Sequence, residues 1–119
     1  MKILFISILT LFLSTSVFSQ SEKDYTTTLE LIKKALNEKK SSLIHEKFDA
    51  KLKGKWSPDK FGKMVDSLHK DKGKMSTYEL IMEDEKEKNF LVEFENGSML
   101  VLLYLSKDGK ITSFQIKDY

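Results

Sequence analysis

The chain has 119 residues, contains no cysteine and carries 20 lysines against 18 acidic residues, which gives a net charge of +2. The absence of cysteine excludes disulfides, zinc–thiolate sites, iron–sulfur clusters and thiol catalysis. Arginine, the side chain best suited to bidentate binding of phosphate and guanine, is absent from the chain. The charge is also nearly balanced, so we expect no nucleic-acid binding.

The first 19 residues have the pattern of an export signal. Lys2 precedes an apolar run from Ile3 to Leu13, and small residues follow up to Ser19. The run is shorter than the roughly 20 apolar residues of a membrane span, which favours cleavage after Ser19 over an uncleaved anchor. We therefore expect a signal peptide over residues 1–19 and one domain over residues 20–119. The mature protein would be periplasmic or secreted, with no membrane attachment.

Two amphipathic helices are predicted in the first half of this domain. Asp24 is the expected N-cap of the first, Ser41 and Ser42 cap the second, and Gly54 ends the second. Apolar residues recur at spacings of three and four, which places them on one face of a helix. These stripes are Tyr25, Leu29, Ile32 and Leu36 in the first helix, and Ile44, Phe48 and Leu52 in the second.

A third helix has the clearest start signal in the chain. Ser57 is the expected N-cap, and Pro58 suits the first helical position. Trp56 and Phe61 flank this start at the spacing of a hydrophobic staple. Gly73 ends the helix, and its buried stripe comprises Phe61, Met64, Val65 and Leu68.

Four strands are predicted after the helices. Met75 to Met82 forms the first, and the charged run from Glu83 to Lys88 is read as a solvated loop. The set of this strand that faces the core is Tyr78, Leu80 and Met82, with Met75, Thr77 and Ile81 as the alternative. Two type I′ turns are expected at Asn96-Gly97 and Asp108-Gly109. They pair Phe94 with Met99, Val92 with Val101 and Phe90 with Leu103, and on the other side Leu105 with Thr112, Leu103 with Phe114 and Val101 with Ile116.

This register separates two faces of the sheet, because side chains alternate along a strand. One face is a continuous apolar wall of Phe90, Val92, Phe94, Met99, Val101, Leu103, Leu105, Phe114 and Ile116. The opposite face carries Leu91, Leu100, Leu102 and Tyr104. Three interpretations of these four side chains remain open. A loop or the chain ends cover them, they are ordinary exposed apolar surface, or they form a surface for self-association or for binding a partner. The predicted fold class is α+β, with three N-terminal helices packed on a curved four-stranded antiparallel meander.

The order of elements resembles the nuclear-transport-factor-two-like cone of the cystatin-like superfamily. More narrowly, the chain resembles a small bacterial domain of unknown function that stands alone or precedes serine hydrolases. The matching stretches are Phe48 to Leu52, Ser57 to Lys60, Gly73 to Met75, Val92 to Gly97, Val101 to Tyr104 and Asp108 to Ile111. In place of the tryptophan often found inside the third helix of that family, this chain has Val65, and Trp56 lies earlier. The resemblance implies a concave sheet, a pocket beneath the helices and dimerisation through the sheet, and it transfers no catalytic residue.

No catalytic, metal or cofactor site is predicted. Ser57 to Lys60 fits the Ser-x-x-Lys pattern of penicillin-binding enzymes, but the companion motifs are absent and an N-cap accounts for the serine. His45 and His69 lack the spacing of a metal site and suit surface or capping roles.

The sequence leaves three functions open. The first is a non-catalytic exported binding domain that forms a homodimer, or binds an unidentified protein, through Leu91, Leu100, Leu102 and Tyr104. The second is a carrier or sensor of a small apolar ligand, with a pocket lined by Trp56, Phe61, Met64 and Tyr78. The third is an isomerase-like enzyme, which would need a buried carboxylate of raised pKa beside a pocket.

Overall fold

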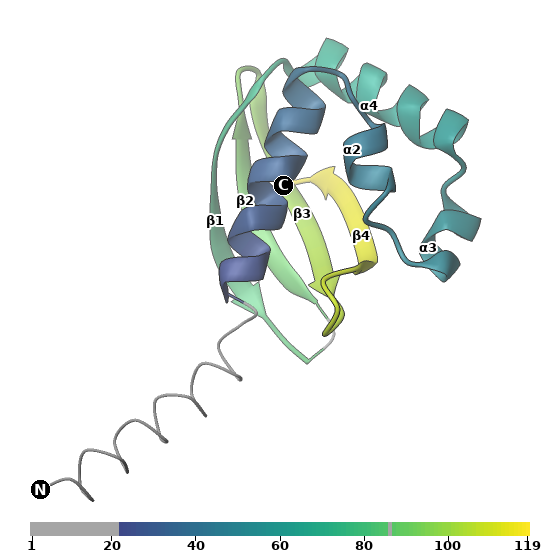
Figure 1. The fold of residues 1–119 in the computed structure, drawn as a ribbon. Coiled ribbons are helices and arrows are strands. Elements are labelled where there is room, and N and C mark those ends of the chain that lie inside the picture. The colour runs from purple at the N-terminus through teal and green to yellow at the C-terminus, as the bar shows by residue number, and fades with distance from the viewer. Residues whose placement is uncertain (1–21, 86) are drawn as a thin grey trace, which may run out of the picture.

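The computed structural model describes residues 22–85 and 87–119, so the predicted signal peptide and its cleavage site lie outside the described residues. The protein is α+β, as the sequence predicts, with helices packed against one four-stranded antiparallel sheet of order β1-β2-β3-β4 (Figure 1). The elements are a helix over residues 22–37, α2 (Ser42–His45), α3 (Ala50–Lys55), α4 (Pro58–Lys72), β1 (Met75–Glu83), β2 (Lys88–Phe94), β3 (Gly97–Leu105) and β4 (Ile111–Asp118).

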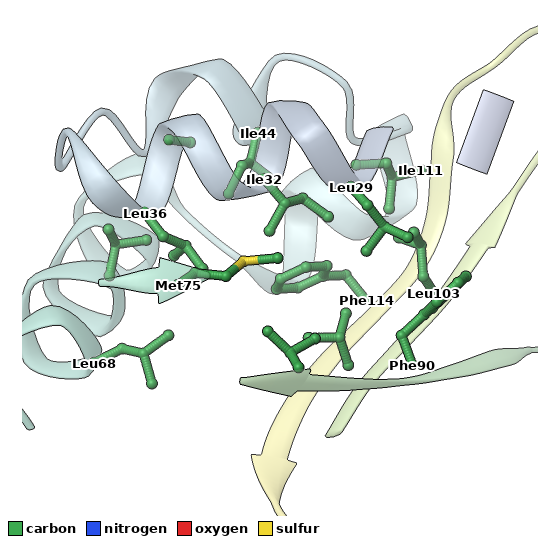
Figure 2. Packing of buried hydrophobic residues seen from close by; sticks show 14 of the residues in the cluster. Leu29, Ile32, Leu36, Ile44, Leu68, Met75, Phe90, Leu103, Ile111 and Phe114 are labelled. Carbon is green, nitrogen blue, oxygen red and sulfur yellow. The ribbon is translucent and has the colours of Figure 1, made fainter. Parts of the chain in front are cut away.

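The helix over residues 22–37 lies across the inner face of the curved sheet (Figure 1). Its predicted stripe is confirmed, since Tyr25, Leu29, Ile32 and Leu36 are each at most 4% exposed. Leu29, Ile32 and Leu36 project toward the sheet, where Met75, Leu103 and Phe114 complete the packed interior (Figure 2). Asp24 lies inside this helix, where its carbonyl accepts a hydrogen bond from Thr28 Oγ1 at 2.8 Å, so its predicted role as N-cap was wrong.

The start of α4 confirms the sequence prediction. Ser57 Oγ accepts a hydrogen bond from the Lys60 N–H at 3.1 Å, and Pro58 opens the helix. The Trp56 and Phe61 rings meet edge to face with centroids 5.4 Å apart, which is the predicted staple.

The second predicted helix is divided into α2 and α3. Between them Phe48 forms a parallel bridge with Ile111 at the start of β4. The Ile111 N–H donates to the Lys47 carbonyl at 2.7 Å, and the Asp49 N–H donates to the Ile111 carbonyl at 2.9 Å. Because these main-chain groups bond to the sheet, they cannot continue a helix. Asp49 then caps α3 by accepting from the Leu52 N–H, and Gly54 lies within α3 rather than ending it.

The sheet confirms the predicted faces but corrects the register of the first hairpin by two residues. Val92 pairs with Met99, Phe90 with Val101 and Phe94 with Gly97. In the second hairpin Leu103 pairs with Phe114 and Val101 with Ile116, as predicted, while Leu105 pairs with Ile111 rather than with Thr112. A shift of two residues leaves every side chain on its predicted face. Eight of the nine residues of the predicted wall are accordingly buried, and Ile116 packs against them partly buried.

Contacts with the α4–β1 junction explain the shifted turn. The amides of Glu95 and Asn96 donate to the carbonyls of Lys74 and Lys72, at 3.0 and 2.9 Å. In return the Lys74 N–H donates to Glu95 Oε1 at 2.7 Å. Gly73 makes this approach feasible, because its φ is +79° and a Cβ there would lie 2.9 Å from Glu95 Oε1. Only Gly97 of the predicted Asn96-Gly97 pair has a positive φ, so the turn is not type I′.

The burial of side chains along β1 matches neither of the two predicted core-facing sets. Met75 is buried opposite Phe94, whereas Leu80 is 46% and Met82 is 63% exposed. The register shifts between Met75 and Thr77 and again between Leu80 and Met82. Tyr78 and Leu80 pair with Val92 and Phe90 on the predicted inner face, and Tyr78 packs partly buried against the core. The shift after Leu80 turns Met82 to the other face, and Leu80 is exposed at the open β1 groove, so Leu80 and Met82 were wrong as core residues.

Candidate functional site

The outer face of the sheet carries the four side chains singled out from the sequence. Tyr104 is 36% exposed, and Leu91 and Leu100 are half-buried. Leu102 is only 8% exposed although it does not belong to the hydrophobic core cluster. Its place outside that cluster agrees with its position on the outer face.

Strand pairing arranges these residues in rows across the outer face. One row runs from Glu79 through Leu91 and Leu100 to Lys117, and the next runs from Met82 through Asn89 and Leu102 to Gln115. Met82, at the edge of the sheet, is separated from Leu102 by Asn89 in this row. We call Met82, Leu91, Leu100, Leu102 and Tyr104 the outer patch.

A groove lies where the first helix passes the end of β1, and we call it the β1 groove. It has a volume of about 390 Å³. Its apolar floor includes Tyr25, Leu29, Leu80 and Phe90, and its rim carries Glu22, Glu79 and Glu83. The groove is open to solvent and combines an apolar interior with a largely acidic rim.

Lys88 shows what chemistry this groove accommodates. Its ammonium lies 4.6 Å from the centroid of the Tyr25 ring and 3.0 Å from Glu83 Oε2. The side chain is only 18% exposed. An aromatic face and a carboxylate together stabilise an ammonium by cation–π attraction and ion pairing, so this corner of the groove is suited to a cation.

Two tyrosines of the β1 groove are held by specific hydrogen bonds. Tyr25 Oη accepts from the Leu105 N–H at 2.9 Å, and burial raises the pKa of Tyr25. Tyr78 Oη donates to Glu30 Oε2 at 2.5 Å. Desolvation, followed by this hydrogen bond to a carboxylate, raises the pKa of Tyr78 to about 12. Both phenols are therefore neutral structural groups at neutral pH and not bases.

A second groove, of about 660 Å³, lies between α3 and β4, and we call it the β4 groove. Lys51, Lys55 and Lys60 line it together with Trp56 and Phe114, and Thr112, Ser113 and Gln115 supply polar groups. Lys60 Nζ lies 5.2 Å from the centroid of the Trp56 ring. The two grooves therefore differ in their balance of charge: three carboxylates and Lys88 line the β1 groove, whereas three lysines and Glu87 line the β4 groove.

The four residues of the predicted pocket are distributed over different places. Trp56 lines the β4 groove, whereas Tyr78 lines the β1 groove. Phe61 is fully buried against Phe48 and Phe114, and Met64 packs partly buried against the core. The sequence did not reveal that Tyr25 and Lys88 would meet at the β1 groove, because they are far apart in the chain and share no motif.

The two histidines differ in their surroundings: His45 has a hydrogen-bond partner, whereas the buried Nδ1 of His69 has none among the described residues. His45 Nε2 lies 2.7 Å from the Trp56 carbonyl, and His69 is in the last turn of α4. Within residues 22–85 and 87–119, no three His, Asp or Glu side chains gather in a way that could hold a metal ion. No carboxylate is buried in that part of the chain.

Comparison with known proteins gave no significant match to a family model, to a curated protein or to a solved structure. None of the helices in the described part of the chain is both long enough and apolar enough to cross a membrane.

Proposed function

We propose that this protein is an exported, non-catalytic binding domain of the nuclear-transport-factor-two-like cone type, and that it pairs with a second copy through the outer patch. The observation that carries the proposal is the outer patch itself. An antiparallel sheet with one face in water normally places polar side chains on that face. Here Leu91, Leu100 and Tyr104 lie there together and retain exposed surface.

The size of the sheet limits the strength of this pairing. Four strands about 4.8 Å apart, each roughly 25 Å long, give an outer face on the order of 500 Å² per copy. Stable protein interfaces bury about 800 Å² on each partner. We therefore expect a weak and reversible dimer.

Analytical ultracentrifugation over a wide concentration range tests this proposal. The protein is purified from the exported fraction of cells that express the full chain. We expect a reversible monomer–dimer equilibrium for the native protein. Tyr104→Glu and Leu100→Glu should each give a folded monomer, because a carboxylate would then have to be buried at the interface. Ser67→Glu, on the exposed side of α4, is the matched control and should leave the equilibrium unchanged.

Leu102→Glu is a poor probe, because Leu102 is only 8% exposed and a charge there would destabilise the fold itself. Circular dichroism of each variant separates loss of pairing from loss of fold. A native protein that stays monomeric at every concentration would contradict the proposal. A dimer that survives both Tyr104→Glu and Leu100→Glu would assign the pairing to another surface.

The alternatives predicted from the sequence have less support. A carrier of an apolar molecule normally buries most of its ligand, whereas both grooves are open to solvent. An isomerase-like site needs a carboxylate in an apolar environment, and no carboxylate in the described residues is buried. Native mass spectrometry of the exported protein would reveal a carrier by a reproducible added mass.

A further inference from the structure

β1 is an edge strand with an unusual surface. It pairs with β2 on one side, and no other strand of the described residues lies on its other side. The first helix reaches β1 through side chains: Asn37 bonds to both the N–H and the carbonyl of Met75, and Glu30 bonds to Tyr78. The second half of β1 makes no comparable contact with this helix. Its edge can therefore accept hydrogen bonds from another extended chain.

Apolar residues occupy this half of the strand. Leu80, Ile81 and Met82 are consecutive and are 46%, 44% and 63% exposed. Natural sheets usually protect an edge with charged residues or proline, because an exposed apolar edge pairs with other chains. The irregularity between Leu80 and Met82 turns Leu80 to the side of the β1 groove and Met82 to the outer face. A strand added here would meet apolar side chains on both of its faces.

The charge around the edge determines what kind of chain would fit. Three carboxylates, those of Glu22, Glu79 and Glu83, line the β1 groove against one lysine, Lys88. Lys88 already demonstrates that an ammonium is held there, between Glu83 and the Tyr25 ring. The edge is therefore complementary to a basic segment, although the whole chain carries a small positive charge.

We propose that the free edge of β1 binds an extended, apolar and basic segment of a partner protein as a fifth strand. An apolar side chain of this segment enters the β1 groove over Leu29 and Phe90, and a neighbouring lysine or arginine pairs with Glu79. Main-chain hydrogen bonds to β1 supply affinity, and the groove and its carboxylates supply specificity. A second copy of this chain is a worse occupant, because antiparallel pairing of two β1 strands brings both sets of these carboxylates together.

A labelled peptide tests the proposal on the exported protein. The probe has nine residues, the length of β1, and alternates lysine with valine; its control alternates glutamate with valine. Fluorescence anisotropy should show saturable binding of the lysine peptide, weakened several-fold at high ionic strength, and at least about tenfold weaker binding of the glutamate peptide. Amide resonances of Tyr78 to Glu83 should shift when the lysine peptide is added.

Variants separate this edge from other surfaces. Leu80→Lys replaces an exposed apolar side chain of the groove with a cation and should weaken binding by about tenfold. Ser67→Lys adds the same charge to α4 and should leave affinity within about twofold. Tyr104→Glu should also leave peptide binding unchanged, so failure of the outer patch and failure of this edge can be told apart.

Three results would overturn the proposal. The first is the absence of saturable binding of the lysine peptide. The second is equal weakening by Leu80→Lys and Ser67→Lys, which would indicate a general effect of charge. The third is loss of self-association in Leu80→Lys, which would assign the edge to a second copy of the chain.

Discussion

The two edge strands of the sheet, β1 and β4, differ in how far other segments cover them. At the β4 edge, Phe48 bridges Ile111 through the main chain, and α3 packs against the strand. At the β1 edge, main-chain contacts to the helices stop near Met75, and the far half of the strand remains exposed. We call the bridged start of β4 the covered edge and the exposed far half of β1 the open edge.

The covered edge should be far more sensitive to truncation than the open edge. Phe48 is 1% exposed and contacts the rings of Phe61 and Phe114. Phe48→Ala should lower the free energy of unfolding by about 3–5 kcal/mol, because it leaves a cavity that the core cannot fill. Leu80→Ala, at a side chain that is 46% exposed, should cost less than about 1 kcal/mol. Urea unfolding of both variants measures the difference, and equal losses would contradict the division between the edges.

The anchored end of β1 should depend on one amide side chain. Asn37 Nδ2 donates to the Met75 carbonyl at 3.0 Å, and the Met75 N–H donates to Asn37 Oδ1 at 2.7 Å. Asn37→Ala should lower the free energy of unfolding by about 1–3 kcal/mol, since both main-chain groups lose their partner. Hydrogen exchange should accelerate at the Met75 amide. Asn96→Ala, in the exposed turn, is the control, and a similar loss there would refute the assignment to Asn37.

The contact between Tyr78 and Glu30 should give a small pH-dependent contribution to stability. The pKa of Tyr78 is raised to about 12, from an ordinary value of 10.0, so the folded protein holds this proton more tightly than the unfolded chain. The stabilisation is complete below pH 10 and is lost as the pH rises toward 12. Ultraviolet titration of tyrosinate measures the transition, and Tyr78→Phe assigns it.

Glu30→Gln tests the cause of this shift. It removes the negative charge beside the phenol, so the pKa of Tyr78 should fall toward its ordinary value. Glu46→Gln, at an exposed site after α2, should leave the titration unchanged. An unchanged titration in Glu30→Gln would leave burial alone as the cause.

Local signals in the sequence were sufficient for most of the fold. The N-cap at Ser57, the staple of Trp56 and Phe61, and the alternation from Phe90 to Phe94 depend on neighbours in the chain, and all are present in the structure. The errors arose where distant segments meet. Phe48 fits a helical stripe but bridges Ile111, and the turn at Asn96 is placed by the carbonyls of the α4–β1 junction. Tertiary hydrogen bonds override local preference at both places.

The surfaces were less predictable than the core. The sequence identified the residues on the outer face, because alternation fixes which face a side chain occupies. It did not identify the β1 groove, which depends on the path of the first helix over the end of β1 and on two register shifts in that strand. A shift of this kind leaves no local mark in the residues. Tyr78 and Trp56 were assigned to one pocket, but they line different grooves.

The junction between α4 and β1 also bears on how this sequence can diverge. The turn at Glu95 and Asn96 contacts Lys74 through its carbonyl and its amide, whereas the Lys72 side chain also lies against Gly97 and 4.0 Å from Asp118. Substitution of Lys74 should therefore be tolerated over evolutionary time more readily than substitution of Lys72. Gly73 and Glu95 are constrained as a pair, since any Cβ at Gly73 would collide with the Glu95 side chain. Relatives of this protein should be recognised more reliably by that glycine–acid pair than by the charged residues around it.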